Sequence, residues 1–323
     1  MIGLGLQTLD LHLLRQTFGV RLQEQAPLAR YTAARLGGPA DALLEVDTIQ
    51  SLVDVVSLAW EYQWPYLILG GGSNVLVSDS GVRGLVIVNR ARQGRFNEAD
   101  SPPTVWAESG ANFGLLARQA AQRGLAGLEW AAGIPGTLGG AVVGNAGAHG
   151  ADMAGSLLLA EILQQNRSAQ QGEVQRQEWP VEKLEYAYRS SILKRQTMEE
   201  LGGPTPVVLA ARLCLERSTP DQVQARIDEF VAYRRLTQPP GASMGSMFKN
   251  PPGDYAGRLI EAVGLKGVRV GDAQISPLHA NFFINLGNAR SSDIRGLIEM
   301  AQEQVKNIFD VELELEIELV GIW

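Results

Sequence analysis

The feature that most constrains the fold of this chain is a glycine-rich segment near its middle. Seven of the eighteen residues from Gly133 to Gly150 are glycine, and none is Asp, Glu, Lys or Arg. Such a segment cannot pack a side-chain core of its own, but it suits a place where backbone must approach a large flat ligand closely. Pro135 stiffens it, and Thr137 and Asn145 offer hydrogen-bonding groups. The alternative is a glycine-rich crossover packed between two sheets.

A second glycine cluster, LGGGSN from Leu69 to Asn74, follows an apolar run. It is not a Walker loop, because no Gly-Lys-Ser/Thr follows, and it misses the dinucleotide-binding fingerprint, because Val75 stands where the third glycine belongs. Its backbone N–H groups, with Ser73 and Asn74 as further donors, are suited to wrap a pyrophosphate. A tight hairpin is the alternative. Two such segments in one domain weaken both alternatives.

The composition is that of a globular protein with two domains, or three. The chain has 323 residues, 45% of them hydrophobic and 20% charged, and a net charge of −7. This balance allows sizeable cores and argues against general nucleic-acid binding, because an acidic surface does not attract a polyanion. The single cysteine, Cys214, excludes an internal disulfide and fits a reducing compartment. Because no stretch approaches the roughly 20 apolar residues of a membrane span, we expect a cytoplasmic protein.

Hydrophobic spacing predicts a mixture of helices and strands. Helices are expected near residues 49–63, 112–123 and 292–308, strands at 66–69, 85–88 and 206–216, and a polar hairpin or loop at 165–178. The clearest helix start is Thr219, a good N-cap that precedes Pro220 and Asp221. We place a domain boundary just before it, near residue 217.

The chain closes with VELELEIELV, residues 311–320, in which apolar residues and glutamates alternate. A period of two predicts a strand with its apolar side chains facing inward and its four glutamates outward.

Seven motifs, taken together, resemble the UDP-N-acetylenolpyruvoylglucosamine reductase (MurB) family, and they follow the family's order from about Leu36 to Gly321. They are LGGPADALLEV, LGGGSNVLVSDSGVRGLVI, GLEWAAGIPGTLGGAVVGNAGAHG, YAYRSS, GSMFKNPPGDYAGRLIEAVGLKG, GDAQISPLHANFFIN and LELEIELVG. The resemblance implies an α+β fold with a two-subdomain FAD-binding region of the vanillyl-alcohol-oxidase type at residues 1–217, its internal boundary near 90. A C-terminal α+β substrate-binding domain would occupy residues 218–323, with the terminal strand 311–320 returning toward the flavin.

The resemblance also implies an activity. A member of the family is expected to reduce UDP-N-acetylglucosamine enolpyruvate to UDP-N-acetylmuramate in peptidoglycan precursor synthesis, and so to serve the cell wall. NADPH would reduce a non-covalent FAD, which would then pass hydride to the enolpyruvyl group. The expected partner is this small-molecule substrate, with no nucleic acid, membrane, obligate protein partner or metal.

The motifs assign site residues by similarity. The expected catalytic residues are Arg189 of YAYRSS, Ser246 of GSMFKN and Glu316 of the terminal strand. The expected cofactor-binding residues are Leu69, Gly70, Gly71, Gly72, Ser73 and Asn74 in the first cluster and Gly133, Ile134, Gly136, Thr137, Gly139 and Gly140 in the second, with Asn145 nearby. The expected substrate-binding residues are Tyr188, Lys249, Asn250, Gln274 and His279, and Tyr186 and Asn281 belong to the same motifs.

The implied chemistry explains the three catalytic residue types. Hydride arriving at the terminal vinyl carbon leaves negative charge on the adjacent carbon and its carboxylate, and a bidentate guanidinium such as Arg189 stabilises that charge as it develops. Ser246 would protonate the carbanion from one side, which requires a site without water. Glu316 would act beside the enolate, either as an acid with a raised pKa or as an orienting group.

Each assignment has a simpler alternative. Arg189 is also suited to a surface salt bridge, and Ser246 to a turn. Glu316 is one of four alternating glutamates, and its choice over Glu314 rests on register with the family motif alone. For the substrate-binding residues, the alternative is ordinary packing and hairpin hydrogen bonding.

The chain departs from the family pattern at His149, where a tyrosine is usual, and at Asp272, where a glycine is usual. Two other functions stay open. Another FAD-dependent oxidase of the same fold would share the glycine loops, although GSMFKN together with YAYRSS argues against it. The second open function is that of a catalytically inactive nucleotide-sugar-binding module. The joint presence of Arg189, Ser246 and Glu316 argues against this function.

Overall fold

The computed structural model describes residues 8–165, 173–195 and 204–323. They fall into two compact units, of which unit 1 comprises residues 45–64 and 87–232 and unit 2 comprises residues 8–44, 65–86 and 233–323. Both units contain helices and strands, which confirms the expected α+β class. The units interleave along the chain, whereas the sequence predicts linear domains with boundaries near 90 and 217; those boundaries stay a prediction.

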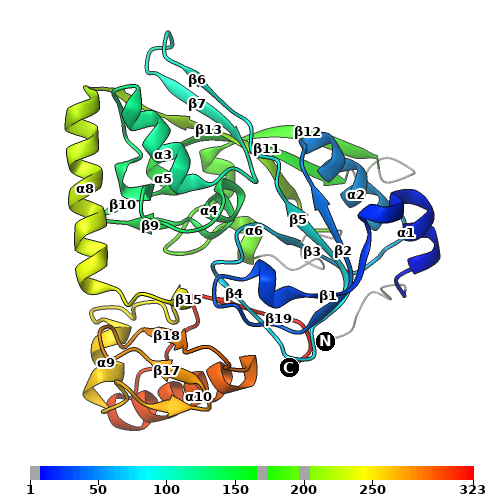
Figure 1. Ribbon diagram of the computed structural model, residues 1–323. Helices are drawn as coiled ribbons and strands as arrows, with labels where there is room; N and C mark the ends of the chain where they lie inside the picture. The colour runs from blue at the N-terminus through cyan, green and yellow to red at the C-terminus, as the bar shows by residue number, and fades with distance from the viewer. Residues whose placement is uncertain (1–7, 166–172, 196–203) are drawn as a thin grey trace. The chain divides into compact units, whose positions relative to one another are not determined.

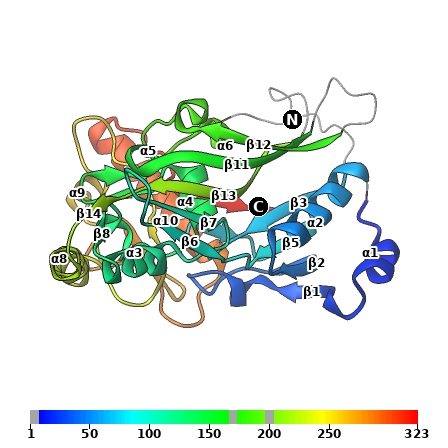
Figure 2. The same cartoon turned by 90° about the horizontal axis from the view of Figure 1, so that it is seen from above.

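Unit 1 is built on a five-stranded antiparallel sheet in the order β12-β11-β13-β7-β6 (Figures 1 and 2). Its strands are β6 (Gly94–Asn97), β7 (Thr104–Glu108), β11 (Leu157–Gln165), β12 (Val174–Pro180) and β13 (Val207–Cys214). The antiparallel pairing of β11 with β12 confirms the hairpin expected at 165–178, of which residues 166–172 lie outside the described residues.

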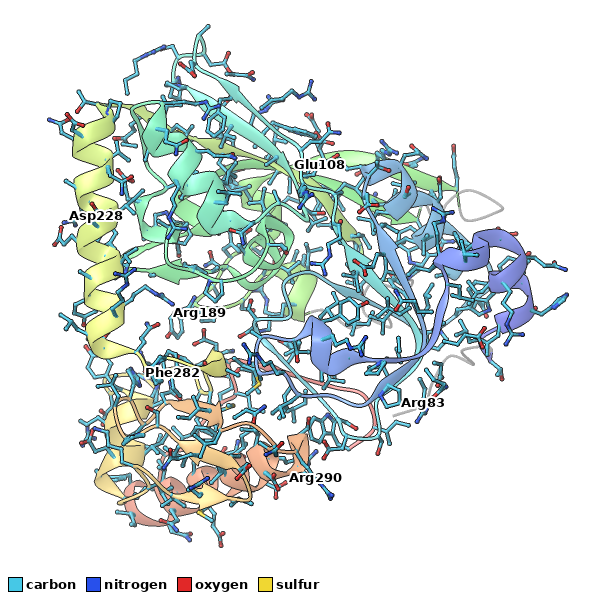
Figure 3. The ribbon with its side chains drawn as sticks, viewed as in Figure 1. Arg83, Glu108, Arg189, Asp228, Phe282 and Arg290 are labelled. Carbon is cyan, nitrogen blue, oxygen red and sulfur yellow. The ribbon has the colours of Figure 1, made fainter. Side chains whose placement is uncertain are left out.

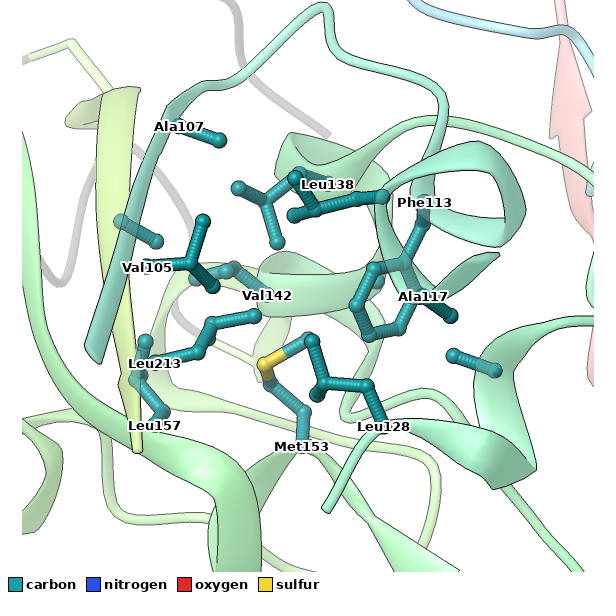
Figure 4. Packing of buried hydrophobic residues seen from close by; sticks show 14 of the residues in the cluster. Val105, Ala107, Phe113, Ala117, Leu128, Leu138, Val142, Met153, Leu157 and Leu213 are labelled. Atoms are coloured by element: carbon teal, nitrogen blue, oxygen red, sulfur yellow. The ribbon is translucent and has the colours of Figure 1, made fainter. Parts of the chain in front are cut away.

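The core of unit 1 includes a helix that precedes the second glycine cluster and a helix that lies within it. α3 spans Phe113–Gln122, and α4, Leu138–Gly144, packs against β7 and β13. Phe113, Leu138 and Val142 are fully buried in the cluster of apolar side chains that Figure 4 shows. The glycine-rich segment therefore builds no core of its own, but it inserts two large side chains of α4 into the core of the unit.

Unit 2 contains two four-stranded sheets. The first has the order β1-β2-β5-β3, with β1 (Gln23–Pro27), β2 (Pro39–Val46), β3 (Tyr66–Leu69) and β5 (Val82–Asn89), the last residues of β2 and β5 being counted in unit 1. The second has the order β15-β18-β17-β16, with β15 (Ala242–Ser246), β16 (Arg269–Val270), β17 (Ala273–Ile275) and β18 (Phe282–Asn285). α10 (Ser291–Phe309) packs on β16 and β17, and α9 (Ala256–Ala262) packs on α10 (Figure 1).

The helices agree with the predicted spacing. The helix expected at 49–63 is α2 (Ile49–Glu61), the one at 112–123 is α3, and the one at 292–308 is α10. α8 (Pro220–Thr237) begins directly after Thr219, whose Oγ1 accepts a hydrogen bond from Gln222 N at 3.4 Å as an N-cap should. The expected strands are confirmed as β3, β5 and β13.

The C-terminal segment is the main correction. A continuous strand over residues 311–320 is wrong, because only Glu318–Val320 forms one, β19, which pairs in parallel with β4 (Val75–Val77). The alternation does identify Leu313 and Ile317 as buried. A strand, however, also needs a partner for its backbone groups, and residues before β19 contribute only an isolated bridge. Leu319, expected to face inward, is exposed, and Glu316, expected to face outward, is half-buried. The pattern thus predicts burial only in part, and it does not show how far a strand extends.

The remaining elements are short. They are α1 (Leu11–Phe18), β8 (Leu125–Ala126), β9 (Gly147–Ala148), β10 (Ala151–Asp152), α5 (Met153–Ser156), α6 (Ile192–Arg195), β14 (Glu216–Arg217) and the 3-10 turns Gly19–Arg21, Leu28–Tyr31, Glu129–Ala131 and Val181–Leu184. Among residues 8–165, 173–195 and 204–323, no helix combines the length and the apolar character needed to cross a membrane.

Candidate active site

Arg189 lies on a two-residue turn in unit 1 (Figure 3). Ala187 and Ser190 exchange backbone hydrogen bonds of 3.0 Å in both directions, so that Tyr188 and Arg189 form the turn between them. Arg189 has φ = +54°, a left-handed conformation that is uncommon for a residue other than glycine and that persists only where its surroundings enforce it. Such positions concentrate at functional sites.

α4 fastens this turn in place. Three side-chain hydrogen bonds connect the end of α4 with the YAYRSS motif: Tyr186 Oη to Val142 O at 2.8 Å, Ser191 Oγ to Val143 O at 2.6 Å, and Asn145 Nδ2 to Ala187 O at 3.0 Å. Burial and the nearby charge of Asp152 raise the pKa of Tyr186, which keeps its hydroxyl protonated as a donor. The second glycine cluster and Arg189 are therefore parts of one construction within unit 1.

Asn145 is central to this construction. It ends α4 in the left-handed conformation, with φ = 45°, and its side chain is buried. Besides Ala187 O, its amide donates to Asp152 Oδ2 at 3.3 Å and accepts from Ala154 N at 3.0 Å. The structure thus shows Asn145 as the residue that ties three segments together, and a contact with the cofactor stays a prediction. No pattern in the sequence signals these long-range contacts.

The glycines of α4 separate into those that the fold needs and those that it does not. Gly139 donates its N–H to Ser109 O at 2.8 Å, and a Cβ there would lie 2.8 Å from Ser109 Cβ. A Cβ at Gly140 would meet nothing closer than 3.7 Å, and one at Gly144 nothing within 4 Å. Glycine inside a helix costs about 1 kcal/mol relative to alanine, so packing within the protein does not explain the latter two.

A bound ligand would explain why these two positions carry no side chain. Gly140 and Gly144 are four positions apart and so share one face of α4. This bare face is where the predicted isoalloxazine-binding loop would accept a flat ring system. The residues present therefore fit FAD at this place, while the contacts predicted for Gly133, Ile134, Gly136 and Thr137 stay predictions.

The first glycine cluster lies in unit 2, between β3 and β4. Gly72 has φ = +59°, and a Cβ on it would lie 2.0 Å from Tyr31 O, so the fold itself requires this glycine. Leu69 is buried at the end of β3, whereas Gly71 is exposed. Asn74 uses its side-chain amide to donate to Glu316 O at 3.1 Å. The predicted pyrophosphate contacts of this loop stay a prediction.

Ser246 ends strand β15 beside a bulge. The pairing of β15 with β18 shifts register between Ser243 and Ser246, so that Ser246 lies opposite Phe282, which Figure 3 labels. Between these pairs, two residues of β15 lie opposite one of β18, and one of the two, Gly245, has φ = +77°, which a side chain would disfavour. A bulge bends its strand and changes the direction of neighbouring side chains, and bulges are common next to active sites.

The segment after Ser246 pairs with the segment that carries Glu316, both in unit 2. Glu316 N donates to Met247 O at 2.9 Å, and Lys249 N donates to Glu314 O at 2.8 Å. The structure thereby pairs Glu316 with Met247, the residue that follows Ser246, so that the segments of two predicted catalytic residues far apart in sequence form one short ladder. Arg189, the third predicted catalytic residue, belongs to unit 1.

The four glutamates of the C-terminal segment differ in their surroundings. Glu314 has a side chain that is 72% exposed and forms an ion pair with Lys249 Nζ. Glu312 and Glu318 are exposed, whereas Glu316 is half-buried. Glu316 is thus the one that does not lie on a solvated face, which supports its choice over Glu314. Its catalytic role stays a prediction.

Three predicted substrate-binding residues of unit 2 have protein partners. Lys249 has a side chain that is only 16% exposed and pairs with Glu314. Asn250 Oδ1 accepts from Ala256 N, the first residue of α9, at 3.1 Å. Gln274 Nε2 donates to Gly267 O at 3.0 Å. Their contacts with substrate stay predictions.

The other two predicted substrate-binding residues, Tyr188 and His279, differ in their exposure to solvent. Tyr188 in unit 1 is 57% exposed. His279 in unit 2 is half-buried, and burial lowers its pKa. Its Nδ1 accepts from Asn281 N at 3.2 Å, so the neutral ring carries its proton on Nε2. In this neutral form, the Nε2–H group of His279 is a hydrogen-bond donor that takes no part in the bond with Asn281 N.

His149, one of the departures from the family motif, stacks on Phe230 of α8. The ring centroids are 4.0 Å apart with an angle of 11° between the planes. The Arg226 guanidinium lies 4.4 Å from the Phe230 centroid, which extends the stack. The structure thus gives the His149 ring a packing role in unit 1. In the described part of the chain, no three His, Cys, Asp or Glu side chains are grouped to hold a metal.

Comparison with known proteins gives the class first. A family model described as "FAD binding domain" matches residues 40–164, and one described as "UDP-N-acetylenolpyruvoylglucosamine reductase, C-terminal domain" matches residues 236–320. The α+β fold, the bare glycine face of α4 and these matches define an FAD-dependent oxidoreductase.

The relatives specify the family. A UDP-N-acetylenolpyruvoylglucosamine reductase from Chloroflexus aggregans is 43% identical over 95% of this chain and 100% of its own length, and one from Rubrobacter xylanophilus is 47% identical over 91% and 94%. The crystal structure of the Thermus caldophilus MurB reductase matches with a TM-score of 0.73 at 37% identity, over 93% of this chain and 98% of that one. The chain belongs to the UDP-N-acetylenolpyruvoylglucosamine reductase family, as the seven motifs predict.

Proposed function

We propose that this chain reduces UDP-N-acetylglucosamine enolpyruvate to UDP-N-acetylmuramate, with FAD as its cofactor and NADPH as its electron donor. The product is a peptidoglycan precursor, so the proposed role is in cell-wall synthesis. The observation that carries the proposal beyond family likeness is the ladder between the Ser246 and Glu316 segments. It holds a hydroxyl and a half-buried carboxylate on adjoining segments, as protonation of an enolate requires.

The residues proposed to bind the cofactor belong to the two glycine clusters, one in each unit. Bound FAD supplies the hydride, which it first receives from NADPH. The face of α4 with Gly140 and Gly144 would hold the flat ring system, since a Cβ at Gly140 would meet nothing closer than 3.7 Å and one at Gly144 nothing within 4 Å. The loop Leu69–Asn74 would hold the pyrophosphate through backbone N–H groups.

Arg189 is proposed to bind the substrate carboxylate. As hydride arrives at the vinyl carbon, charge spreads into this carboxylate, and a guanidinium with two parallel donors binds the more highly charged form more strongly. The turn at Ala187 and Ser190, fastened to α4, would fix the guanidinium before the substrate arrives. Pre-organised charge of this kind lowers the barrier because nothing has to rearrange during the reaction.

Ser246 is proposed to donate its Oγ proton to the carbanion carbon, and Glu316 to act beside the enolate. A serine hydroxyl is a weak acid, so it serves only where the carbanion is more basic and water is excluded. The bulge at Gly245 and the ladder to Glu316 support a fixed direction of attack. Delivery from one side gives one stereoisomer of the product.

The two other functions find less support. The relatives reported above carry the reductase name over more than nine-tenths of this chain, which does not favour another oxidase. The joint presence of Arg189, Ser246 and Glu316 does not favour an inactive module. We further propose that the protein works in the cytoplasm, where its single free cysteine, Cys214, stays reduced.

The proposal is tested by separating the two half-reactions. Purified protein is reduced with NADPH in the absence of oxygen, UDP-N-acetylglucosamine enolpyruvate is added, and flavin absorbance is followed. Prompt reoxidation is the expected result. A flavin that is reoxidised only when air enters would favour the oxidase, and a protein without flavin would contradict the cofactor assignment.

A further inference from the structure

We propose that Asn281 is a positioning residue for Ser246, because its side chain takes the place of a neighbouring strand and fixes the two residues that follow the serine. The inference rests on the proposed role of Ser246 as proton donor. It gives Asn281 a task different from the substrate contact that its motif suggests.

Asn281 contacts the segment after Ser246 through three hydrogen bonds. Phe248 N donates to Asn281 Oδ1 at 2.9 Å, and Asn281 Nδ2 donates to Phe248 O at 2.8 Å. Met247 N donates to the backbone oxygen of Asn281 at 2.8 Å. The amide therefore satisfies both polar groups of one residue, as a strand partner would. Because Asn281 is only 3% exposed, water does not compete for these bonds.

A side chain is needed here because the strand partner ends. The pairing of β15 with β18 is antiparallel, and Ser246 lies opposite Phe282, the first residue of β18. Just before β18 the chain turns, since Phe282 N bonds to His279 O at 2.9 Å. Phe248 is 1% exposed, and a buried backbone group left without a partner destabilises the fold. The Asn281 amide removes this destabilisation.

The position of Ser246 depends on this clamp. The bulge at Gly245 directly precedes the serine, and the residues directly after it are held by Asn281 on one side and by Glu316 N on the other. Removing the Asn281 side chain takes away both bonds to Phe248 and leaves the segment held by the Glu316 segment and by the backbone bond from Met247 N to Asn281 O. Proton transfer requires a close approach of donor and acceptor, and a displacement of about 1 Å costs about 100-fold in rate.

The amide of Asn281 is engaged by Phe248 and is buried. Its oxygen and nitrogen are bonded to Phe248, and its backbone N–H is bonded to His279 Nδ1 at 3.2 Å. One N–H and one lone pair of the amide take no part in these bonds, but Asn281 is only 3% exposed, so a substrate has little access to them. The effect of Asn281 should therefore fall on the proton-transfer step and not on substrate affinity.

The test is single-turnover reoxidation of the NADPH-reduced holoenzyme by UDP-N-acetylglucosamine enolpyruvate, with its rate constant and its half-saturation concentration measured separately. Asn281→Ala should slow the limiting rate by about 10- to 100-fold, leave half-saturation unchanged and leave flavin reduction by NADPH unchanged. In the Ser246→Ala background, Asn281→Ala should cause no further loss, because it acts through the serine. A purely structural role would not produce this non-additivity.

Asn285→Ala is the matched control. Asn285 is the last residue of β18, the strand that Asn281 directly precedes. It donates to Ala34 O at 3.0 Å and accepts from Gly287 N at 2.8 Å, so it also bonds to backbone through its amide. It makes no hydrogen bond with Met247 or Phe248 among those the structure gives. Its variant should lose stability without a specific loss in reoxidation.

Four results would overturn the inference. The first is a wild-type rate in Asn281→Ala, and the second is a loss of equal factor with and without Ser246. If Asn281→Ala does not fold, Asn281→Asp is used instead, because aspartate keeps the acceptor for Phe248 N and loses the donor to Phe248 O. A wild-type rate in Asn281→Asp is then the third result. A wild-type protein that is not reoxidised at all would instead overturn the proposed reaction, and this inference with it.

Discussion

The side-chain amide of Asn74 donates a hydrogen bond to the carbonyl oxygen of Glu316 at 3.1 Å, across 242 positions of sequence. The connection is reinforced in the opposite direction, because Glu318 N donates to Asn74 O at 2.9 Å, where β19 begins to pair with β4. A residue expected to bind the cofactor through its side chain thus holds the backbone of a residue expected to act on the substrate. The first glycine cluster and the C-terminal segment form one part of unit 2.

Asn74→Ala should therefore impair the reaction of the substrate more than the binding of flavin. A hydrogen bond of this kind contributes about 1 kcal/mol, so we expect reoxidation by the substrate to slow roughly fivefold while flavin content stays close to that of the wild type. Ser73→Ala, next to it in the predicted pyrophosphate loop, should impair the binding of flavin more than the reaction of the substrate. Loss of flavin from Asn74→Ala, with normal turnover once flavin is restored, would refute the assignment to Glu316.

Glu316→Gln should cost far more activity than Glu314→Gln. A group that takes part in proton transfer contributes about 10²- to 10⁴-fold, and Glu316 is half-buried on the ladder with Met247. Glu314 is exposed and pairs with Lys249, and an exposed pair contributes at most about 1 kcal/mol. Measuring the steady-state kcat of both variants compares the two losses of activity. The reverse order would mean that the family register is displaced by two residues.

Sequence patterns predicted the local structure well where one element depends mainly on its own residues. The apolar stripe of α10 and the N-cap Thr219 of α8 are examples, since helix hydrogen bonds form within the segment. The strand expected at 311–320 failed for the opposite reason, because strand pairing depends on a partner elsewhere in the chain. Burial in this segment was predicted only in part, because Leu313 and Ile317 are buried whereas Leu319 is exposed.

The same distinction applies to the candidate site. Motifs identified Arg189 and Ser246, yet the residues that hold them were recognised only from the structure. Tyr186 and Asn145 fasten the Arg189 turn to α4, and their partners lie more than forty positions away along the chain. No spacing rule indicates which buried amide will bond to which loop. Conversely, the glycines of α4 were evident in the sequence, but only the structure separates Gly139 from Gly144.

Arg189→Lys should nearly abolish turnover while the protein stays folded. Lysine has no planar pair of donors, so it cannot bind a carboxylate in the bidentate way proposed for arginine, and loss of one fixed donor to developing charge costs about 100-fold or more. Single-turnover reoxidation measures the effect. The turn, held by Ala187, Ser190 and α4, should persist, which near-ultraviolet circular dichroism can check. Near-normal turnover would refute the carboxylate clamp.

Asp79 should make the stability of unit 2 depend on pH in the acid range. Its Oδ1 and Oδ2 accept from Ser291 N at 2.8 Å and Ser292 N at 3.0 Å, which caps α10. Burial raises the pKa of Asp79, but the bonds from Ser292 and Ser291 and the charge of Arg290 outweigh it and place the pKa below its ordinary value of 3.8.

A depressed pKa in the folded state means that Asp79 stabilises the protein above about pH 4 and that this contribution disappears as the pH falls through the folded-state pKa. Asp79→Ala should lower the free energy of unfolding by about 1 kcal/mol at neutral pH, and its difference from wild type should shrink in more acidic solution. Urea unfolding across the pH range measures both. A difference that stays constant with pH would contradict an ionised cap.

Gly144→Ala should stabilise the protein without its cofactor and weaken the binding of FAD. A Cβ at Gly144 meets nothing within 4 Å, and alanine is favoured over glycine in a helix by about 1 kcal/mol, so the apoprotein should melt at a higher temperature. The same methyl group would project from the face proposed for the flavin and raise the dissociation constant of FAD. Gly139→Ala is the matched control, since its Cβ would lie 2.8 Å from Ser109 Cβ and should destabilise the apoprotein itself. Melting of apoprotein and titration with FAD distinguish the two variants, and unchanged FAD affinity in Gly144→Ala would place the flavin elsewhere.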